Sequence, residues 1–484
     1  MPAARTALEA AYLHARELDD RAELAAALGP GDPDLTARAA QARDRVRADL
    51  VALGGTDDPA VAAMLAWAGP ASGGGGEDLA EIERAYAREQ GAVHVGGQRL
   101  TRLAVLGLLG REPDPHTRRD LFLALRPVWA AIDGDGDDSP YRRMLPDSAR
   151  RWAGGGPVAA NATALGLDPA SVEPDLVAVL DTWRQVSAAR DPIEPWDWWY
   201  VHGTTARVLR EATPVGRLRP LSDAYHAALG ADPAALDVRY DTAPRPDRPP
   251  VPVAYTTFGS RPRPGRRAQP WVLGTYTAGG LGELTELVHE TGHALHVAAI
   301  DTRPAYADWP DSDAFTEAVA ELTALDTAEP AWQRRWLGGE VPEPVSLRDR
   351  YADVMLDVCW ALLEIRLHAD PTRRPNDVWA ELTSTYLGVV AHPELSWWAM
   401  RGQLVQEPGY MVNYALGPII AADLRAAVRA VRGDWTGGDP GWYGWVSAHV
   451  YRWGLSRGCG QVLRDVLGRA PSATALLAQL RRAG

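Results

Sequence analysis

Apolar residues recur with the period of an amphipathic helix along most of this 484-residue chain. The apolar positions are mainly Ala and Leu, and Arg, Glu and Asp fill the positions between them. A period near 3.6 residues places the apolar side chains on one helix face, which can pack against a neighbouring helix. The same pattern resumes after Leu347 and continues almost to the C-terminus. The chain is therefore predicted to be mainly α-helical.

The segment Pro244–Pro270 departs from this pattern, because it is rich in Pro and Arg. Two short β-prone runs, Val251–Phe258 and Trp271–Tyr276, lie in it or directly after it. Neighbouring runs of this kind, bounded by turn residues, are typical of a hairpin. We expect one small antiparallel sheet here and no other strands. The glycine-rich stretch Gly69–Gly76 is predicted to be a flexible connector.

The stretch ELTELVHETGHALHVAAI, residues 283–300, contains an H-E-x-x-H pattern formed by His289, Glu290 and His293. Two histidines four residues apart lie on the same helix face, roughly 6 Å apart along the axis. Both imidazoles can therefore bind one metal ion, with Glu290 beside them to take a proton from a water molecule at the metal. The alternative is a pair of core histidines that bond to the backbone.

A glutamate in the next predicted helix, Asp313–Thr327, supplies a third ligand. Glu317 follows His293 by 24 residues, with a loop rich in Pro and Asp between them. Three protein ligands leave one position free for water, which is typical of a catalytic zinc site. Two imidazoles and one carboxylate suit zinc better than manganese or cobalt, so we expect one Zn²⁺ on His289, His293 and Glu317. Glu321, one turn later, either accepts the free N–H of a ligating histidine or is an exposed helix residue.

Four segments make the chain resemble the HEXXH-plus-glutamate zinc peptidases, which include thimet oligopeptidase, angiotensin-converting enzyme and the thermostable metallocarboxypeptidases. VHETGHALH, residues 288–296, is similar to the first motif of the thimet-type members, to which the likeness is closest. FTEAVAELTAL, from Phe315, is similar to the glutamate helix of the converting-enzyme branch. EPWD, residues 194–197, and PGYMVNY, residues 408–414, resemble a P-W-D and a Gly-Tyr-x-x-x-Tyr segment of thimet-type enzymes.

The resemblance implies a two-lobed helical ellipsoid with zinc on the floor of a deep substrate channel. It divides the chain into an N-terminal helical lobe, residues 1–190, and a catalytic region, residues 191–484, which together form one structural unit. It also assigns Tyr410 and Tyr414 as donors to the oxyanion that develops on the scissile carbonyl. Many members carry a histidine a few residues before the first tyrosine, whereas positions 405–407 are Val, Gln and Glu here. No histidine donor is therefore carried over.

The activity implied is peptide-bond hydrolysis, in which Glu290 takes a proton from water and delivers it to the leaving amine. Arg401 is a candidate for binding a peptide's C-terminal carboxylate, and a structural salt bridge is the alternative. Gly279 and Gly280, just before the H-E-x-x-H helix, are candidates for close backbone approach to a substrate or for a hinge. Alternatively, they simply end a strand.

Composition limits the class of protein, its partners and its cellular location. Hydrophobic residues make up 46% and charged residues 23% of the chain, as in ordinary soluble enzymes. The formal net charge of -13 argues against a nucleic-acid partner. Two cysteines, Cys359 and Cys459, cannot make a disulfide framework, which indicates a reducing compartment. No run is long and apolar enough to span a bilayer. We expect a cytoplasmic protein without a membrane partner, and the oligomeric state is open.

Four functions are compatible with these observations. The first is an oligopeptidase that cleaves short unstructured peptides, and the second is a carboxypeptidase or dipeptidase with the same chemistry. The size of the released fragment distinguishes them. The third is a zinc amide hydrolase dedicated to one small-molecule biosynthetic intermediate, which would be inert toward general peptides. The fourth is a zinc-binding protein without catalysis, against which the presence of Glu290 argues because the metal does not need it.

Overall fold

The computed structural model describes residues 2–53, 58–69, 77–132, 139–187, 191–245, 250–251, 253–263 and 265–484. Most of the predicted connector Gly69–Gly76 and part of Pro244–Pro270 lie outside these ranges. The chain is mainly α-helical, which confirms the prediction from its periodicity. Within the described ranges, no helix has both the length and the apolar character that a membrane crossing requires.

Helices and strands follow one another in this order before residue 190: α1 (Pro2–Leu28), α2 (Pro33–Leu53), α3 (Pro59–Ala68), α4 (Glu77–Gln90), β1 (Val93–Val95), β2 (Gln98–Leu100), α5 (Arg102–Leu109), α6 (Pro115–Leu123), α7 (Arg126–Ile132), α8 (Pro140–Arg151), α9 (Gly156–Leu165) and α10 (Val172–Ser187).

The remaining elements are α11 (Trp198–Val201), α12 (Thr204–Val208), α13 (Val215–Ala228), β3 (Arg239–Asp241), β4 (Tyr255–Ser260), β5 (Gln269–Leu273), α14 (Leu281–Ala299), α15 (Asp313–Ala324), α16 (Pro330–Leu337), α17 (Glu343–Ala369), α18 (Pro375–Leu387), α19 (Gln403–Gln406), α20 (Met411–Arg432), α21 (Trp442–Val446), α22 (Cys459–Leu467) and α23 (Thr474–Arg482).

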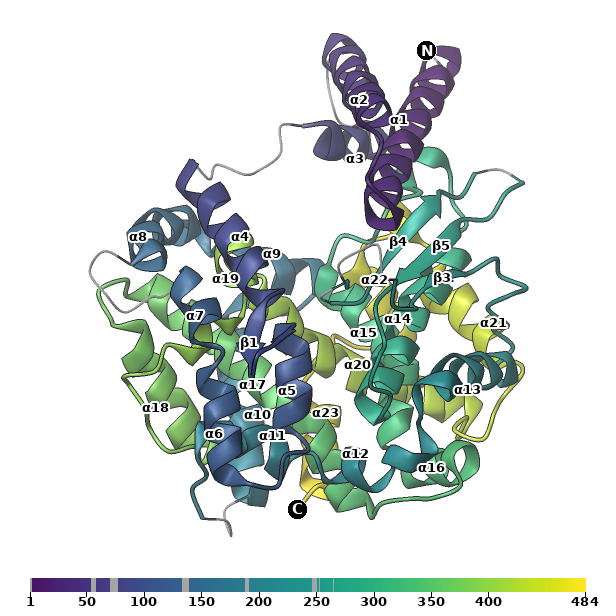
Figure 1. Cartoon of the computed structure of the whole chain (residues 1–484). Helices are drawn as coiled ribbons and strands as arrows, with labels where there is room; N and C mark the ends of the chain where they lie inside the picture. The colour runs from purple at the N-terminus through teal and green to yellow at the C-terminus, as the bar shows by residue number, and fades with distance from the viewer. Residues whose placement is uncertain are drawn as a thin grey trace.

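The first three helices, α1–α3, form a group of their own above the strands β4 and β5 (Figure 1). They share a small apolar core that includes the buried side chains of Tyr12 and Met64. Helix α1 packs against β4, and polar contacts reinforce this packing: Arg261, directly after β4, donates to Asp20 at 2.8 Å. Helices α1–α3 are therefore attached to the side of the molecule that carries β4.

Helices α4–α10 lie on the other side of the molecule and pack against different partners (Figure 1). Helices α8 and α10 contact α17, and α10 also contacts α18 and α23. Residues 2–69 and residues 77–187 thus rest on separate parts of the chain that follows. The division at residue 190 stays a prediction, and the boundary itself falls within residues 188–190, outside the described ranges.

The predicted sheet is present, but its topology and limits differ from the prediction. Strands β4 and β5 are antiparallel, as expected, while β3 joins β5 in parallel, so the three-stranded sheet is mixed. The sequence analysis missed β3 because the strand is only three residues long and lies outside the β-prone runs. A second small sheet, the hairpin β1–β2, also contradicts the expectation of a single strand region.

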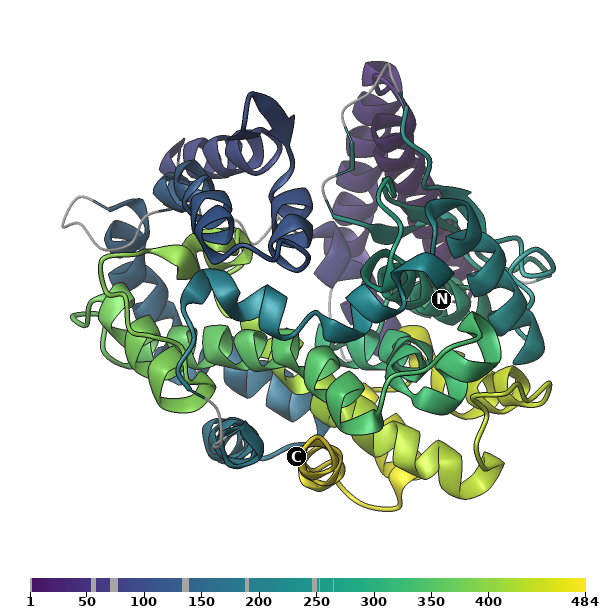
Figure 2. The ribbon, with the colours of Figure 1, turned by 60° about the horizontal axis from the view of Figure 1, so that its bottom comes forward.

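Four helices form the centre of the molecule. Helix α15 packs against both α14 and α20, and α17 packs against α20. Leu284, Leu287 and Val288 of α14 are buried, so the apolar face of the H-E-x-x-H helix is in the core. Seen from below, the groups α1–α3 and α4–α6 stand apart above these central helices (Figure 2).

Candidate metal centre and active site

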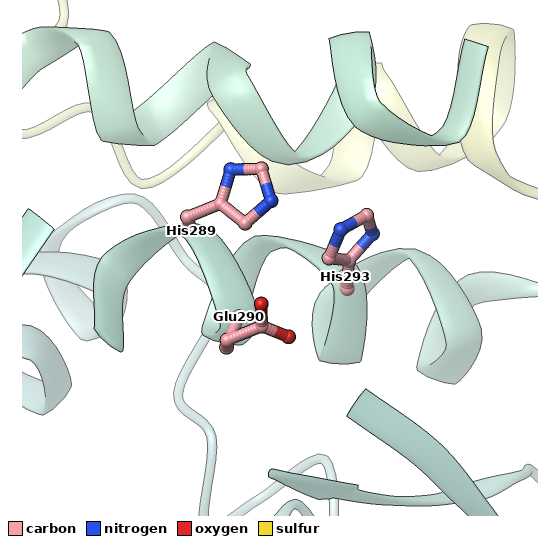
Figure 3. Close-up of side chains that lie close together, drawn as sticks. All are labelled: His289, Glu290 and His293. Atoms are coloured by element: carbon pink, nitrogen blue, oxygen red, sulfur yellow. The ribbon is translucent and has the colours of Figure 1, made fainter. Parts of the chain in front are cut away.

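Helix α14 places the side chains of the H-E-x-x-H pattern together. His289, Glu290 and His293 each offer a ligand atom, and these atoms lie within 4.8 Å of one another. The two imidazole centroids are 4.7 Å apart, because residues four apart are neighbours on one helix face. Figure 3 shows both rings projecting from α14 toward an adjacent helix. The spacing in the sequence therefore brings the three side chains as close together as predicted, and their binding of a metal stays a prediction.

Helix α15 brings Glu317 to this group. Glu317 Oε2 lies 3.4 Å from His289 Nε2. The approach depends on Gly292, because a Cβ at this position would lie 2.7 Å from the Ala320 carbonyl oxygen of α15. A glycine between the two histidines thus lets α14 and α15 touch along their backbones. The predicted third ligand is adjacent to His289.

Glu321 orients His289 from the same helix. His289 Nδ1 lies 2.9 Å from Glu321 Oε1, and the other oxygen of Glu321 pairs with Arg350 of α17. Burial alone would lower the pKa of His289, but its contacts with Glu317 and Glu321 raise it well above the ordinary value. The sequence left Glu321 either as a partner of a histidine or as an exposed residue, and in the structure it contacts His289. Nε2 of the same ring faces Glu317.

Glu290 is buried and held in place by the sheet. Thr256 of β4 donates a hydrogen bond to Glu290 Oε2 at 2.8 Å. Burial raises the pKa of Glu290 to about 7, although the nearby His289 and the Thr256 hydrogen bond oppose this shift. A carboxyl group with a pKa near neutrality can both accept and return a proton. The sequence analysis did not single out Thr256, since sequence spacing does not reveal a contact between β4 and α14.

Tyr410 and Tyr414 lie together at the beginning of α20, with ring centroids 5.2 Å apart. Burial, and then the negative charge of Glu317, raise the pKa of both phenols well above the ordinary value. Both side chains therefore keep their protons near neutral pH and are available as hydrogen-bond donors. Their electrostatic coupling to Glu317 puts them in the neighbourhood of the predicted ligand set.

A cleft of about 890 Å³ separates the two sides of the molecule. Its walls include α5, the segment 275–283 and parts of α17. Gly279, Gly280 and Arg401 all line it, as expected for substrate-binding candidates. Arg401 also reaches the tyrosines, because its guanidinium lies 5.8 Å from the centroid of Tyr414. The cleft and the tyrosine pair are thus neighbours.

Arg401 is engaged in a structural contact at the same time. Its guanidinium pairs with Asp357 of α17 and lies 4.6 Å from the centre of the Trp360 ring. The salt bridge that the sequence analysis kept as an alternative is therefore present. Arg401 lines the cleft with its charge already compensated.

A second arginine in the cleft, Arg102, was not singled out from the sequence. It begins α5, lines the cleft and is only 8% exposed. Its Nε atom is buried without a hydrogen-bond partner, and no ion pair of Arg102 exists within the described ranges. Burial lowers the pKa of Arg102, and the charge of Arg401 adds to this effect. The sequence gives no signal for this burial, because an arginine at the start of an amphipathic helix is usually exposed.

No protein-family model and no curated protein sequence matches the chain. Solved structures match over nearly their whole length. Trypanosoma cruzi metallocarboxypeptidase 1 has a TM-score of 0.58 at 14% identity, covering 100% of this chain and 99% of that one. Pyrococcus furiosus carboxypeptidase has a TM-score of 0.55 at 13% identity, covering 98% and 97%. The M32 carboxypeptidase from Deinococcus radiodurans R1 has a TM-score of 0.53 at 15% identity, covering 92% and 89%.

These matches show that the chain shares its fold with carboxypeptidases. At such low identity a likeness of structure establishes the fold, and function has to be argued from the site. The fold is of the helical kind that the resemblance to zinc peptidases implied. The closer likeness to thimet oligopeptidase stays a prediction.

Proposed function

We propose that this protein is a zinc-dependent peptidase that hydrolyses bonds in short peptides and cuts next to the C-terminus. One observation carries the proposal. The imidazoles of His289 and His293 lie together on α14, the Glu317 carboxylate of α15 is 3.4 Å from His289, and a buried Glu290 that the metal does not require lies beside the imidazoles. Metal ligands together with a separate general base are typical of a hydrolase rather than of a purely structural metal site.

The residues present fit a zinc ion. Nitrogen from His289 and His293 and oxygen from Glu317 form a donor set that zinc accepts, with a position left for water and substrate. His289 is held by Glu321 through Nδ1, which leaves Nε2 for a metal. When bound, zinc acts as a Lewis acid that polarises a carbonyl and lowers the pKa of water.

The proton transfers belong to Glu290. Its carboxylate accepts a proton from the attacking water, and the resulting carboxylic acid delivers that proton to the leaving amine. A pKa raised to about 7 by burial makes both transfers accessible near neutral pH. Thr256 keeps the carboxylate oriented, because its hydroxyl donates to Oε2 at 2.8 Å. No other carboxylate is needed for the reaction.

The phenols of Tyr410 and Tyr414 supply the donors for the developing oxyanion. Their raised pKa keeps them protonated, so each presents an O–H group rather than a negative charge. A donor that meets charge as it develops stabilises the transition state by roughly 3 kcal/mol. The pair is also consistent with a chain that has no histidine at positions 405–407.

Arg102 favours cleavage near the C-terminus over internal cleavage. The Nε atom of this largely buried guanidinium has no hydrogen-bond partner and its charge has no counter-ion within the described ranges, which favours the binding of an anion. The C-terminal carboxylate of a peptide is such an anion and matches the planar fork of arginine. We therefore assign carboxylate binding to Arg102 and a supporting position to Arg401, whose charge Asp357 already balances.

Mass spectrometry of a peptide library tests this function. The library contains peptides of 5–15 residues, each as a free acid and as a C-terminal amide, and is incubated with zinc-loaded protein. The wild type should release one or two residues from the free acids. Glu290→Gln should bind zinc and release nothing, while the exposed Glu381→Gln control should cut normally.

Other outcomes would redirect the proposal. Internal cleavage of acids and amides alike would favour an oligopeptidase. If no peptide is cut although the wild type holds one zinc ion, peptidase activity is ruled out and an amide hydrolase for a small-molecule intermediate takes its place. A cytoplasmic location and the absence of nucleic-acid and membrane partners remain predictions.

A further inference from the structure

A buried carboxylate of α17 holds the backbone on both sides of Tyr410. Glu364 Oε1 accepts a hydrogen bond from the Gly409 N–H at 2.7 Å, and Oε2 accepts one from the Met411 N–H at 3.1 Å. The Glu364 side chain is 0% exposed. The Gly409 N–H belongs to the Pro408–Gly409 peptide unit and the Met411 N–H to the Tyr410–Met411 unit, so one side chain, 45 residues away in sequence from Gly409, holds the backbone before and after the tyrosine.

Glu364 has no cation to balance its charge within the described residues. Its burial raises its pKa to about 8, although the two backbone N–H donors lower it and the charge of Glu407 raises it further. A carboxyl group with this pKa is mostly protonated near neutral pH, so its burial does not leave an unpaired charge in the core. Each of its two oxygens nevertheless accepts a backbone N–H beside Tyr410.

Pro157 and Trp152 also confine the tyrosine segment. Gly409 has φ +98°, and a Cβ there would lie 2.6 Å from Pro157 and 2.7 Å from the Trp152 ring. Trp152 in turn stacks on His368, with ring centroids 3.7 Å apart, and His368 lies one turn after Glu364 on α17. The segment therefore sits between a carboxylate and an aromatic stack, with little freedom to move.

We propose that Glu364 is a positioning residue that sets the direction of the Tyr410 phenol. This inference rests on the proposed function, in which Tyr410 donates to the oxyanion. The Met411 N–H donates to Glu364 and the Tyr410 N–H donates to the Glu407 carbonyl at 2.9 Å, so both peptide units at Tyr410 are held and its Cα–Cβ direction is restricted. A donor that is displaced by a fraction of an ångström loses much of its benefit in the transition state.

The test is Glu364→Gln in the full zinc-loaded chain. Glutamine fills the same space but has one acceptor oxygen, and its amide nitrogen faces the second N–H. We expect kcat to fall about tenfold and KM to stay within about twofold, since the lost interaction acts only in the transition state. Adding Glu364→Gln to Tyr410→Phe should cause no further loss of kcat, because the group being positioned is gone.

A matched control separates positioning from simple destabilisation. Asp423 is also buried and accepts a hydrogen bond from the Ser472 N–H at 2.8 Å, but it lies farther along α20 from Tyr410 and also pairs with Arg469. Asp423→Asn should lower the melting temperature and leave kcat unchanged. The positioning role is wrong if Glu364→Gln lowers only the melting temperature, or if its effect on kcat persists in full beside Tyr410→Phe.

A measurement that does not depend on catalysis tests this inference separately from the proposed function. Amide hydrogen exchange should be slow at Gly409 and Met411 in the wild type. In Glu364→Gln it should be at least about tenfold faster at one of these amides, because that amide loses its hydrogen bond to the side chain. If the wild type cuts no peptide, the proposed function fails, while the exchange experiment still measures whether Glu364 holds the two amides. Unchanged exchange at both amides would show that Glu364 does not hold them.

Discussion

The metal centre and the cleft beside it are assembled in different ways. The candidate metal centre takes its side chains from α14 and α15, which are consecutive helices joined by residues 300–312. The cleft takes its walls from α5, the segment 275–283, α17 and Arg401, which are far apart in sequence. The first region is built by helix periodicity and one helix contact. The second exists only because distant segments pack around it.

The two regions also differ in whether their charged side chains have ion-pair partners. At the candidate metal centre, Glu321 contacts both His289 and Arg350, and Glu317 contacts His289. In the cleft, Arg401 is balanced by Asp357, while Arg102 has no ion-pair partner within the described ranges. Paired charges suit side chains that must stay fixed, and an unpaired cation suits an anionic ligand that binds and dissociates.

The largest effect should come from removing a metal ligand. His293→Ala should abolish stoichiometric zinc binding and lower activity by more than about a thousandfold, beyond the 10–100-fold effect of outer contacts. Metal analysis and peptide cleavage measure the two effects. The exposed His449→Asn should retain both. Full activity in His293→Ala without bound zinc would contradict the assignment of the metal centre.

A smaller but selective effect is expected at Arg102. Arg102→Met keeps the apolar stem and removes the charge, so kcat/KM for free-acid peptides should fall about 30- to 100-fold. Cleavage of the matching C-terminal amides should stay at the wild-type level, whatever that level is. Arg84→Met, an exposed arginine on α4, serves as the control. Equal losses on acids and amides would mean that Arg102 does not bind the carboxylate.

Glu321 tests whether the paired network supports the metal. Glu321→Gln should weaken zinc binding about 10- to 100-fold, because His289 loses a charged acceptor and Arg350 loses its partner. Competition with a chelator measures the affinity, and Glu340→Gln, at an exposed site, controls for the loss of a carboxylate. An unchanged zinc affinity would leave Glu321 a purely structural residue.

The smallest effect concerns the pH dependence of stability near the tyrosines. The folded protein holds the pKa of Glu364 at about 8, above its ordinary value of 4.5. The folded state therefore binds a proton that the unfolded state has lost between these pH values. Its contribution to stability is fully present below about pH 4.5 and is lost as pH rises through about 8.

Comparison with Glu364→Gln isolates this contribution. Between pH 5 and 7.5 the free energy of unfolding of the wild type should fall relative to the variant by at most about 1.4 kcal/mol per pH unit. Urea unfolding at several pH values, with both proteins free of metal, measures the difference. Parallel pH profiles would show that the Glu364 carboxyl is not held in its protonated form.

Much of the metal centre was determined by the sequence itself. The four-residue spacing of His289 and His293 dictates one helix face, and Glu317 and Glu321 share a face of the next helix for the same reason. The helical class followed from periodicity in the same way. These features depend on local geometry, because within a helix the spacing of residues in the sequence fixes the relative positions of their side chains.

The tertiary structure alone decided the rest. Strand β3 pairs in parallel with β5 across a long connection, and residues 2–69 pack on the sheet rather than with α4–α10. Arg102 and Glu364 look ordinary in the sequence, since nothing local reveals that one will be buried without a partner and the other will hold Gly409 and Met411. Burial and long-range hydrogen bonds depend on which surfaces meet, and periodicity carries no information about that.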